Sequence, residues 1–396
     1  MQSNAFGFNT SRAALLIGIF LLLSASFTLF GQQASPSGSA PAATSPKTAT
    51  TPEDKPQTAT GASTPALSEE KKPVEVPGLD SKTGIPLYET IQEDWSSLEI
   101  GTSNLKPAMP VFGYTDETDK FTRTLVQLKW RPGDGLDLYV IMPKGVKNPP
   151  AVLYLYGYKD DTDRFRNDGW CERATSGGTA AIGFVSALSG QRFHDRPLEQ
   201  WFVSELQESL GSTVHDVKFI LDFLADSGEI DMSRIGMFGQ SSGGAIALLT
   251  AAADQRIKAV EVLDPWGDWP VWLAKSPVTK EDIHGTNFAT PGFEKKVENL
   301  DPVKWLPTLQ SKKVEILQVT GNAATPAEAQ KAIRDAAPKN AEVVVYDKLA
   351  DLVKADSGGH IFDWVKTALN QMPAAENKSQ VAADAGPKPE KVSKEK

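Results

Sequence analysis

A serine in this chain lies in a pattern that can form a nucleophile. Residues 238–244 read Phe-Gly-Gln-Ser-Ser-Gly-Gly, which contains Gly-x-Ser-x-Gly centred on Ser241. A serine hydroxyl attacks a carbonyl carbon when a base takes its proton and nearby donors hold the resulting oxyanion. In a chain with 31 glycines the five-residue pattern alone is weak evidence. The neighbouring segments must therefore decide between a nucleophile and a serine in a glycine-rich turn.

The segments around Ser241 are those that a nucleophile turn needs. The apolar run 234–238 predicts a short strand before the motif, and 243–253 predicts a helix after it. A strand–turn–helix of this kind exposes the serine hydroxyl, and the free N–H groups at the helix start favour an oxyanion. Gly239 and Gly243 have no Cβ and allow a sharp turn. We therefore interpret Ser241 as a nucleophile.

The remaining apolar runs alternate between strand-like and helix-like segments. A hairpin is predicted from 121–130 and 136–142, which flank a turn-rich connection. Further strands are predicted at 151–156, 179–187, 258–263, 314–320 and 341–347, and further helices at 212–225, 326–336 and 361–370. Buried strands that alternate with helices predict an α/β fold with a mostly parallel central sheet flanked by helices, opened by an antiparallel hairpin.

Over most of 120–372 the sequence resembles the α/β-hydrolase superfamily, in particular secreted esterases and prolyl-oligopeptidase-like serine hydrolases. The resemblance rests on the strand order, on Gly-Gln-Ser-Ser-Gly-Gly at 239–244 and on a histidine after the last strand. It implies the α/β-hydrolase fold and a triad in the chain order serine, acid, histidine. That order leaves His284 and His360 as the base. His360 follows the strand 341–347, where the family places its base, whereas His284 lies in a polar insertion.

The acid of the triad departs from the family pattern. The family usually supplies it in the turn after the strand 314–320, and here that turn contains no carboxylate. Some lipases carry the acid one strand earlier, in a Leu-Asp-Pro string similar to the one that holds Asp264. We therefore expect Asp264 to orient the histidine, with Asp268 and then Glu328 as alternatives. A purely structural role for Asp264 at the end of its strand also remains open.

An oxyanion hole is expected from two places in the chain. One donor is the Ser242 N–H, and the other comes from the loop after the strand 151–156. That loop begins Tyr156-Gly157-Tyr158, similar to a Tyr-Gly-Tyr run in prolyl-oligopeptidase-like enzymes. The resemblance implies Tyr158 as the second donor, through its backbone or its hydroxyl, with Tyr156 as the alternative. A tyrosine that only packs under the loop is the competing interpretation.

Residues 265–309 form an insertion between two predicted core strands. It contains four of the nine tryptophans, namely Trp266, Trp269, Trp272 and Trp305. Open α/β sheets bind ligands at the C-terminal edge of their strands, so aromatic side chains there can line an acyl or aryl pocket. The alternative is that they attach the insertion to the core.

The two ends of the chain differ in composition from its middle. Residues 1–30 are predicted to be a signal peptide or an N-terminal anchor, because 13–30 is an apolar run that follows an arginine. Residues 31–79 are rich in Ala, Pro, Ser and Thr and predict a disordered linker, and the polar residues 373–396 predict a disordered tail. The hydrolase domain is therefore expected at 80–372. We expect an exported protein, either periplasmic or secreted. If 13–30 is not cleaved, it would tether the protein to a membrane.

Composition excludes several classes of partner. The net charge is −9 and no cluster of Lys and Arg is present, which argues against nucleic acid. The four histidines are scattered and Cys171 is the sole cysteine, so no metal site is expected. No dinucleotide- or phosphate-binding glycine motif appears, and no cofactor is expected. Cys171 is expected to be a small buried residue.

These patterns predict an exported serine hydrolase that cleaves a carboxylic ester through an acyl-serine intermediate. The substrate would be a small molecule or a peptide. One alternative is a peptidase or acyl-peptide hydrolase of the prolyl-oligopeptidase-like kind, which the Tyr-Gly-Tyr run favours. Another is a non-catalytic envelope binding protein on a hydrolase fold, which the missing carboxylate after 314–320 favours.

Overall fold

The computed structural model describes residues 93–101, 103–131, 134–158, 160, 162–189, 192, 206–280, 292–322, 324–358 and 360–374. These residues belong to one compact unit, Thr90–Lys396. The predicted leader 1–30 and linker 31–79 lie outside the described residues, as does the predicted tail 373–396 after its first two residues. Every helix among the described residues is too short or too polar to span a lipid bilayer.

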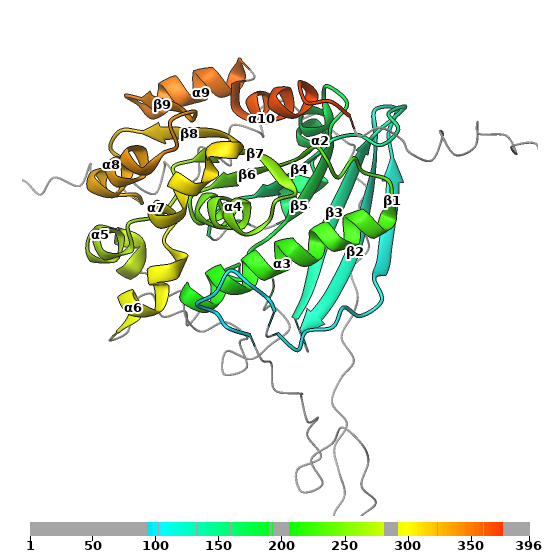
Figure 1. Cartoon of the computed structure of the whole chain (residues 1–396). Helices are drawn as coiled ribbons and strands as arrows, with labels where there is room; N and C mark the ends of the chain where they lie inside the picture. The colour runs from blue at the N-terminus through cyan, green and yellow to red at the C-terminus, as the bar shows by residue number, and fades with distance from the viewer. Residues whose placement is uncertain are drawn as a thin grey trace, which may run out of the picture. The chain divides into compact units, whose positions relative to one another are not determined.

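Nine strands of the described residues form one sheet in the order β1-β2-β3-β5-β4-β6-β7-β8-β9 (Figure 1). The strands are β1 Val111–Glu117, β2 Phe121–Arg131, β3 Asp134–Pro143, β4 Ala151–Leu155, β5 Ala180–Phe184, β6 Ile235–Gln240, β7 Ile257–Leu263, β8 Lys313–Val319 and β9 Glu342–Tyr346. Along this order, the neighbours from β1 to β5 pair antiparallel (β1 with β2, β2 with β3 and β3 with β5). All neighbours from β5 through β4, β6, β7 and β8 to β9 pair parallel. The predicted fold class, a mostly parallel sheet with an antiparallel opening hairpin, is confirmed.

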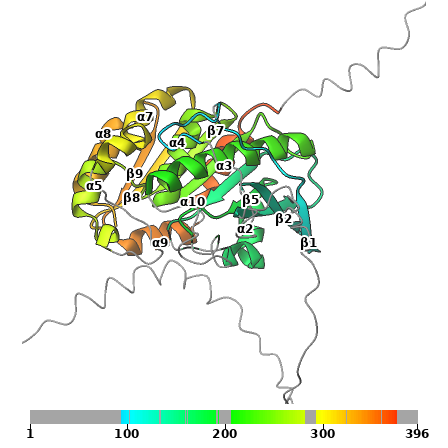
Figure 2. The ribbon, with the colours of Figure 1, turned by 90° about the horizontal axis from the view of Figure 1, so that it is seen from below.

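Helices cover both faces of this sheet. The helices are α2 Asp168–Thr175, α3 Leu206–Ser227, α4 Ser242–Ala253, α5 Trp269–Lys275, α6 Phe293–Val297, α7 Pro302–Trp305, α8 Ala327–Ala336, α9 Leu349–Ser357 and α10 His360–Asn370. Figure 2 shows α3 and α4 on one side of the sheet and α2 and α9 on the other. Helix α10 packs on β6 and β7 from the face opposite α4, because a Cβ on Gly236 would meet α10 and one on Gly239 would meet α4.

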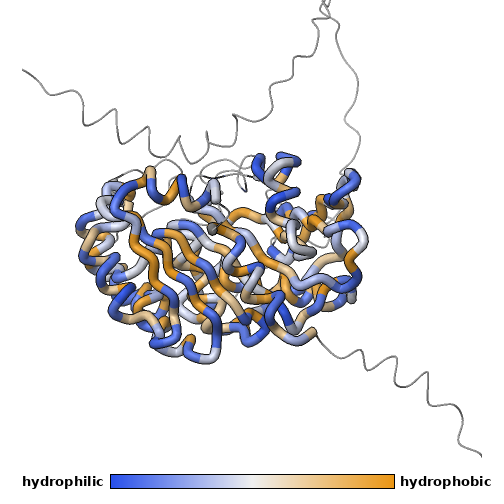
Figure 3. The backbone as a smooth tube through the Cα atoms, turned by 90° about the horizontal axis from the view of Figure 1, so that it is seen from above, coloured by the Kyte–Doolittle hydropathy of each residue, from blue (hydrophilic) through white to orange (hydrophobic). Residues whose placement is uncertain are grey.

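The core lies on the central strands and on α4. All residues of β4, and the first five of β6, are buried. In Figure 3 the hydrophobic (orange) stretches lie mainly in the middle of the domain, and the hydrophilic (blue) stretches lie mainly at its periphery. The first ten residues of α4 are also buried, since the helix is enclosed by the sheet, α3 and α7. A helix that is apolar on all sides is expected in such a place. The core therefore fixes α4, and with it the turn that precedes α4.

Some elements are not predicted from the sequence. Strand β1 is an edge strand whose side chains are mostly exposed, so it has no buried apolar face to detect. Helix α3 begins at Leu206, six residues before the predicted start at 212. Helices α2 and α9 span only 8 and 9 residues, lengths at which periodicity is weak.

A buried ionic cluster joins the first described residues to the sheet and to α3. Its members are Glu93, Arg131, Asp134, Arg192, His215 and Asp216. Arg131 donates to both carboxylate oxygens of Glu93, at 2.7 and 2.9 Å, and also pairs with Asp216. His215 Nδ1 lies 2.8 Å from Glu93 Oε2. Because a buried charge that loses its partner is costly, this cluster ties the segment around Glu93 firmly to the domain.

Candidate active site

Ser241 lies at a sharp turn between β6 and α4. Its backbone has φ 53° and ψ −115°, a conformation that is rare for any residue other than glycine. Its N–H donates to Leu263 O at 2.9 Å and its carbonyl oxygen accepts from Trp266 N–H at 3.1 Å. Ser241 is 8% exposed. Such strain persists where the surrounding structure enforces it, and a nucleophile elbow also places its serine on a strained strand-to-helix turn.

The Ser241 hydroxyl does not cap the following helix. A serine at the N-cap usually accepts a hydrogen bond from an N–H of the first helical turn. Within the described residues Ser241 is the N-cap of α4, and its side chain makes no such bond. A Cβ added to Gly157 would lie 3.2 Å from Ser241 Cβ and 3.6 Å from its Oγ. Helix capping therefore does not account for Ser241, and the Gly157 backbone borders its hydroxyl.

Two glycines of the motif permit close packing of backbones. A Cβ on Gly239 would lie 2.4 Å from Gly243 O, and a Cβ on Gly243 would lie 2.2 Å from Leu155 O. Neither glycine has a positive φ, because the positive φ of the turn belongs to Ser241. The glycines are thus required by contact between β6, α4 and the end of β4, and the sharp turn itself is made at the serine.

The loop after β4 is bonded to the residue that follows Ser241. The Tyr158 N–H donates to Ser242 Oγ at 2.8 Å, and both residues are buried. The Tyr158 ring packs against Trp266, with ring centroids 6.4 Å apart. The Tyr156 hydroxyl accepts from Trp170 Nε1 at 2.9 Å. The two parts of the chain predicted to form the oxyanion hole are therefore directly joined.

Asp264 directly follows β7, but its carboxylate is bound at the end of β8. Its Oδ1 accepts from Val319 N–H at 2.9 Å and from Gln330 Nε2 at 3.2 Å. Its Oδ2 accepts from Asn322 Nδ2 at 2.8 Å. Burial raises the pKa of the Asp264 carboxyl to about 6, although these three donors oppose the rise. The carboxylate thus lies beside the turn in which the family usually carries its acid.

The two alternative acids lie in different surroundings. Asp268 is the N-cap of α5, where burial and the nearby carboxylate of Asp301 raise its pKa. Glu328 lies in the first turn of α8, where it is exposed and pairs with Lys275 at 2.6 Å. By contrast, Asp264 lies on the chain between Leu263 and Trp266, whose backbones are both bonded to Ser241.

His360 is the first residue of α10, and its side chain lies outside the described part of the structure. Phe362, two residues later, packs edge-on against Phe238 of β6, with ring centroids 4.9 Å apart. The start of α10 therefore lies beside the strand that leads to Ser241. His194 and His284 fall outside the described residues. His215 is buried in the ionic cluster, with Nε2 3.2 Å from Ser97 O.

Comparison with solved structures identifies the architecture. The acetyl xylan esterase from Paenibacillus sp. R4 superposes with a TM-score of 0.50 at 16% identity, over 69% of this chain and 91% of that one. The acylaminoacyl peptidase from Pyrococcus horikoshii superposes with a TM-score of 0.51 at 14% identity, over 67% of this chain and 44% of that one. This chain has the α/β-hydrolase fold.

Sequence comparison finds a family match around Ser241. The model of the acetyl xylan esterase family (AXE1) matches residues 212–268, which run from within α3, through the turn at Ser241, to the residue before α5. No curated protein matches the chain with significant sequence similarity. The matched segment contains both Ser241 and Asp264, and it supports a carboxylesterase-like serine hydrolase.

The tryptophans of the insertion mostly belong to the core of the domain. Trp266, Trp269 and Trp272 are at most 1% exposed, and the rings of Trp266 and Trp272 lie 4.4 Å apart. Of the two predicted roles, attachment of the insertion to the core therefore describes these three. Trp305 is partly buried and packs against the same core.

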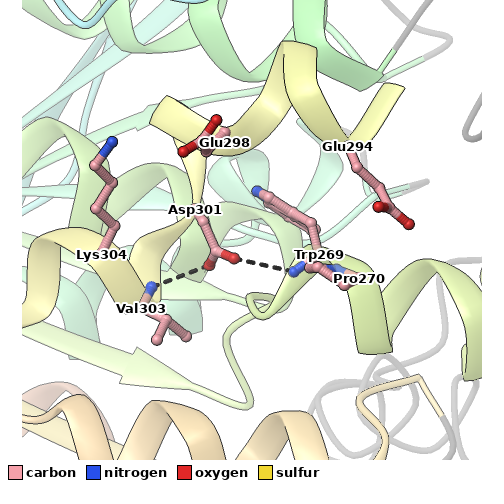
Figure 4. Close-up of a pocket in the computed structure, with 7 residues that line it drawn as sticks. All are labelled: Trp269, Pro270, Glu294, Glu298, Asp301, Val303 and Lys304. Atoms are coloured by element: carbon pink, nitrogen blue, oxygen red, sulfur yellow. Dashed lines mark hydrogen bonds between the residues drawn. The ribbon is translucent and has the colours of Figure 1, made fainter. Parts of the chain in front are cut away.

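A pocket of about 290 Å³ opens on the insertion (Figure 4). It is lined by Trp269, Pro270, Glu294, Glu298, Asp301, Val303 and Lys304. Asp301 accepts hydrogen bonds from the N–H groups of Trp269 and Val303, each at 3.1 Å, and so fixes one wall. These residues hold the insertion together and include none of the predicted triad.

The described residues contain no group of three or more His, Cys, Asp and Glu side chains placed to hold a metal ion. Cys171 is free and buried, as predicted, and burial raises the pKa of its thiol to about 11. A thiol with so high a pKa is a poor nucleophile at neutral pH. Cys171 is therefore a packing residue.

Proposed function

We propose that this protein is an exported serine hydrolase that cleaves a carboxylic ester through an acyl-serine intermediate. The observation that carries the proposal is the strained backbone of Ser241, with φ 53° and a side chain that makes no capping bond to α4 among the described residues. A serine with an ordinary structural role would not need this conformation. The acetyl xylan esterase family match over 212–268 supports an ester as the substrate.

In this mechanism Ser241 Oγ attacks the ester carbonyl carbon while His360 takes the serine proton. The tetrahedral intermediate collapses, the alcohol leaves with the proton from His360, and an acyl group remains on Ser241. Water, activated by the same histidine, then attacks the acyl-serine and releases the acid. No cofactor takes part in these steps. The position of α10 beside β6 supports His360 as the base, because it brings the start of that helix to the nucleophile strand.

Asp264 is the acid that we propose to orient His360. Its carboxylate is bound to Val319 N–H and Asn322, at the strand end where the family usually places this group. A carboxylate supplied from β7 can therefore take the place of one supplied from the turn after β8. The pKa of about 6 leaves Asp264 mainly ionised at neutral pH, as the role requires.

The oxyanion hole is proposed to combine the Ser242 N–H with the loop at Tyr156–Tyr158. The bond from Tyr158 N–H to Ser242 Oγ supports this pairing, since it holds the loop against the start of α4. In the free protein Tyr158 N–H is occupied by that bond. Rotation of the Ser242 hydroxyl would release it to an oxyanion, while the N–H groups at the start of α4 supply the other donor.

Export is proposed from the sequence. The apolar run 13–30 follows a basic residue, as in a secretory signal or a single-span anchor. The composition of 31–79 suits a linker between such a segment and the hydrolase domain. The protein would then act in the periplasm or outside the cell, on a small ester.

Labelling with a fluorophosphonate probe tests the proposed nucleophile. We expect the wild-type protein to be labelled and Ser241→Ala to be unlabelled, with Ser233→Ala as a matched control that keeps labelling. Equal labelling of wild type and Ser241→Ala would refute the assignment. A folded wild type that is not labelled at all would favour the non-catalytic binding protein.

A second measurement separates ester from peptide substrates. The Pyrococcus acylaminoacyl peptidase shares the fold, but the chain spans less than half of that protein's length. We expect turnover of p-nitrophenyl acyl esters to exceed that of peptidyl anilides. The reverse preference would favour a peptidase.

A further inference from the structure

A row of side chains crosses the sheet under α10. Register pairs link Tyr154 to Phe238, Phe238 to Glu261, Glu261 to Glu315 and Glu315 to Glu342, from β4 to β9. Glu261 and Glu315 are fully buried. A buried carboxyl group in a central parallel strand is costly, because the interior solvates charge poorly. The burial of Glu261 is therefore expected to be offset by hydrogen bonds that its carboxyl group accepts.

Glu261 holds the backbone at the start of α10. Its Oε1 accepts from Phe362 N–H at 2.9 Å, and its Oε2 accepts from Val365 N–H at 3.1 Å. The first N–H groups of a helix have no partner within the helix, and a carboxylate is favoured at that end. Here the carboxylate comes from the sheet below. It therefore fixes both the height and the direction at which α10 begins.

The backbone at this point is bent. Ile361 has an extended ψ of 134°, and Phe362 has φ 75° and ψ −32°. A positive φ is a genuine outlier for a bulky residue, so other contacts must enforce it. The Phe362 ring packs edge-on against Tyr154 and Phe238, and its N–H is held by Glu261.

Arg173 holds the same bend from the other side. Its Nη2 donates to Ile361 O at 3.0 Å, and its guanidinium carbon lies 4.9 Å above the Phe362 ring. Asp356 pairs with Arg173 at 2.6 Å and keeps it in place. The peptide group between Ile361 and Phe362 is thus fixed by two hydrogen bonds. Its N–H donates to Glu261, and its carbonyl oxygen accepts from Arg173.

His360 directly precedes Ile361, the first residue of this fixed peptide. We propose that Glu261 is a positioning residue that sets where the chain presents His360, by holding the bent start of α10 against the sheet. The proposal rests on the proposed function, in which His360 is the base. Glu261 lies on the nucleophile's neighbouring strand, so one strand pair would carry both the attacking serine and the support of its base.

The test compares Glu261→Gln with Glu315→Gln. The first variant keeps the side-chain shape but replaces one acceptor oxygen with a donor that faces an N–H. The second removes a buried carboxyl from the same row and leaves both Glu261 bonds in place. For Glu261→Gln we expect kcat for a p-nitrophenyl ester, and the fluorophosphonate labelling rate, to fall about 100-fold, as for a small misplacement of a catalytic group.

KM should stay within about twofold, since ground-state binding is untouched. Glu315→Gln should keep both rates within about threefold of wild type. A Glu261→Gln protein with wild-type kcat and labelling rate would overturn the proposal. If wild type itself is not labelled, the proposed function fails instead, so the two failures are distinct.

A double-mutant cycle separates positioning from a general effect on the fold. If Glu261 acts through His360, Glu261→Gln should not slow the residual labelling of a His360→Ala protein any further. An equal additional loss in that background would overturn the proposal. Should Glu261→Gln fail to fold, Arg173→Gln tests the other hydrogen bond to the same peptide group. Arg173→Gln should lower kcat and the labelling rate when His360 is present. It should leave the residual labelling rate of the His360→Ala protein unchanged, and equal losses in both backgrounds would again overturn the proposal.

Discussion

Asp264 supplies a carboxylate from one strand to the end of the next. The residue follows β7, whereas two of its three donors, Val319 and Asn322, belong to the end of β8 and the turn after it. The side chain of Asn322 is also held, because its Oδ1 accepts from Ala324 N–H at 2.9 Å. Its amide N–H therefore points at Asp264. Asn322 and Asp264 form a pair, and an aspartate at either of the two positions would place a carboxylate at the end of β8.

This pair leads to a prediction about the proposed triad acid. Asp264→Asn should lower kcat by about 10³- to 10⁴-fold, the loss seen when a triad histidine loses its carboxylate. The double variant Asp264→Asn with Asn322→Asp returns a carboxylate to the turn after β8 and should recover part of that loss. Steady-state kinetics on a p-nitrophenyl ester provide the measurement. A single variant with near wild-type kcat would assign Asp264 a structural role only.

The residues of the site differ in how far the sequence predicts them. The elbow at Ser241 is predictable, because the glycines, the strand before and the helix after are all adjacent in the chain. The partners of Asp264 are not, since Asn322 and Gln330 lie 58 and 66 residues away. Their contact depends on β7 and β8 being neighbours with aligned ends. The role of Gly157 beside Ser241 also escapes prediction, because it requires the β4 loop to approach the elbow.

At the scale of elements, the elbow depends on how closely α4 approaches the end of β4. The Gly243 backbone leaves no room for a side chain, because a Cβ there would meet both Leu155 O and Tyr156 O, at 2.2 and 2.6 Å. Backbone carbonyl oxygens at the end of a central strand cannot rotate away as a side chain can. Any added atom must therefore move α4, and Ser241 with it.

We accordingly predict that Gly243→Ala is both destabilising and inactivating. Overpacking of this kind costs about 1–3 kcal/mol, or more where backbone is displaced. Gly101→Ala is the matched control, because nothing lies within 4 Å of the added Cβ. Thermal unfolding and fluorophosphonate labelling of the two variants provide the comparison. A Gly243→Ala protein with wild-type stability and labelling would show that α4 can shift without cost.

Helices and strands are predictable from the sequence where their burial produces a recognisable pattern of apolar residues. The central strands are continuous apolar runs, and their predicted positions agree with β4 to β8 within a few residues. Glu261 and Glu315 interrupt two of these runs. Their burial is not predictable, because it results from the in-register alignment of β7 with β8 and from α10 above them.

For the molecule as a whole, the buried glutamates determine how stability changes with pH. Burial raises the pKa of Glu261 to about 7, and burial together with the charge of Glu261 raises that of Glu315 to about 9. An unfolded glutamate has a pKa of about 4.3. Between these values the folded protein retains protons that the unfolded chain releases. The free energy of unfolding should therefore decrease as the pH rises from about 5 to about 8. Above pH 8 Lys312 opposes the decrease, because burial lowers its pKa to about 8 and the unfolded chain then retains the proton.

Glu315→Gln tests this expectation. The variant removes one titrating group, so its stability should exceed that of wild type near pH 8. Its loss of stability with rising pH should be shallower by up to about 1.4 kcal/mol per pH unit, which is the effect of a difference of one bound proton. Urea unfolding at several pH values provides the measurement. Parallel curves for the two proteins would mean that Glu315 titrates alike in the folded and unfolded chains.

The ionic cluster around Glu93 has a mechanical consequence. Tension applied to the chain from its N-terminal side reaches Glu93 before it reaches β1, which begins at Val111. There the load passes through two hydrogen bonds to Arg131 on β2 and a contact with His215 on α3. Force is thus divided between a strand and a long helix and does not peel the edge strand from the sheet. A pull on the N-terminal side of the domain would therefore load these interior contacts before it loads β1.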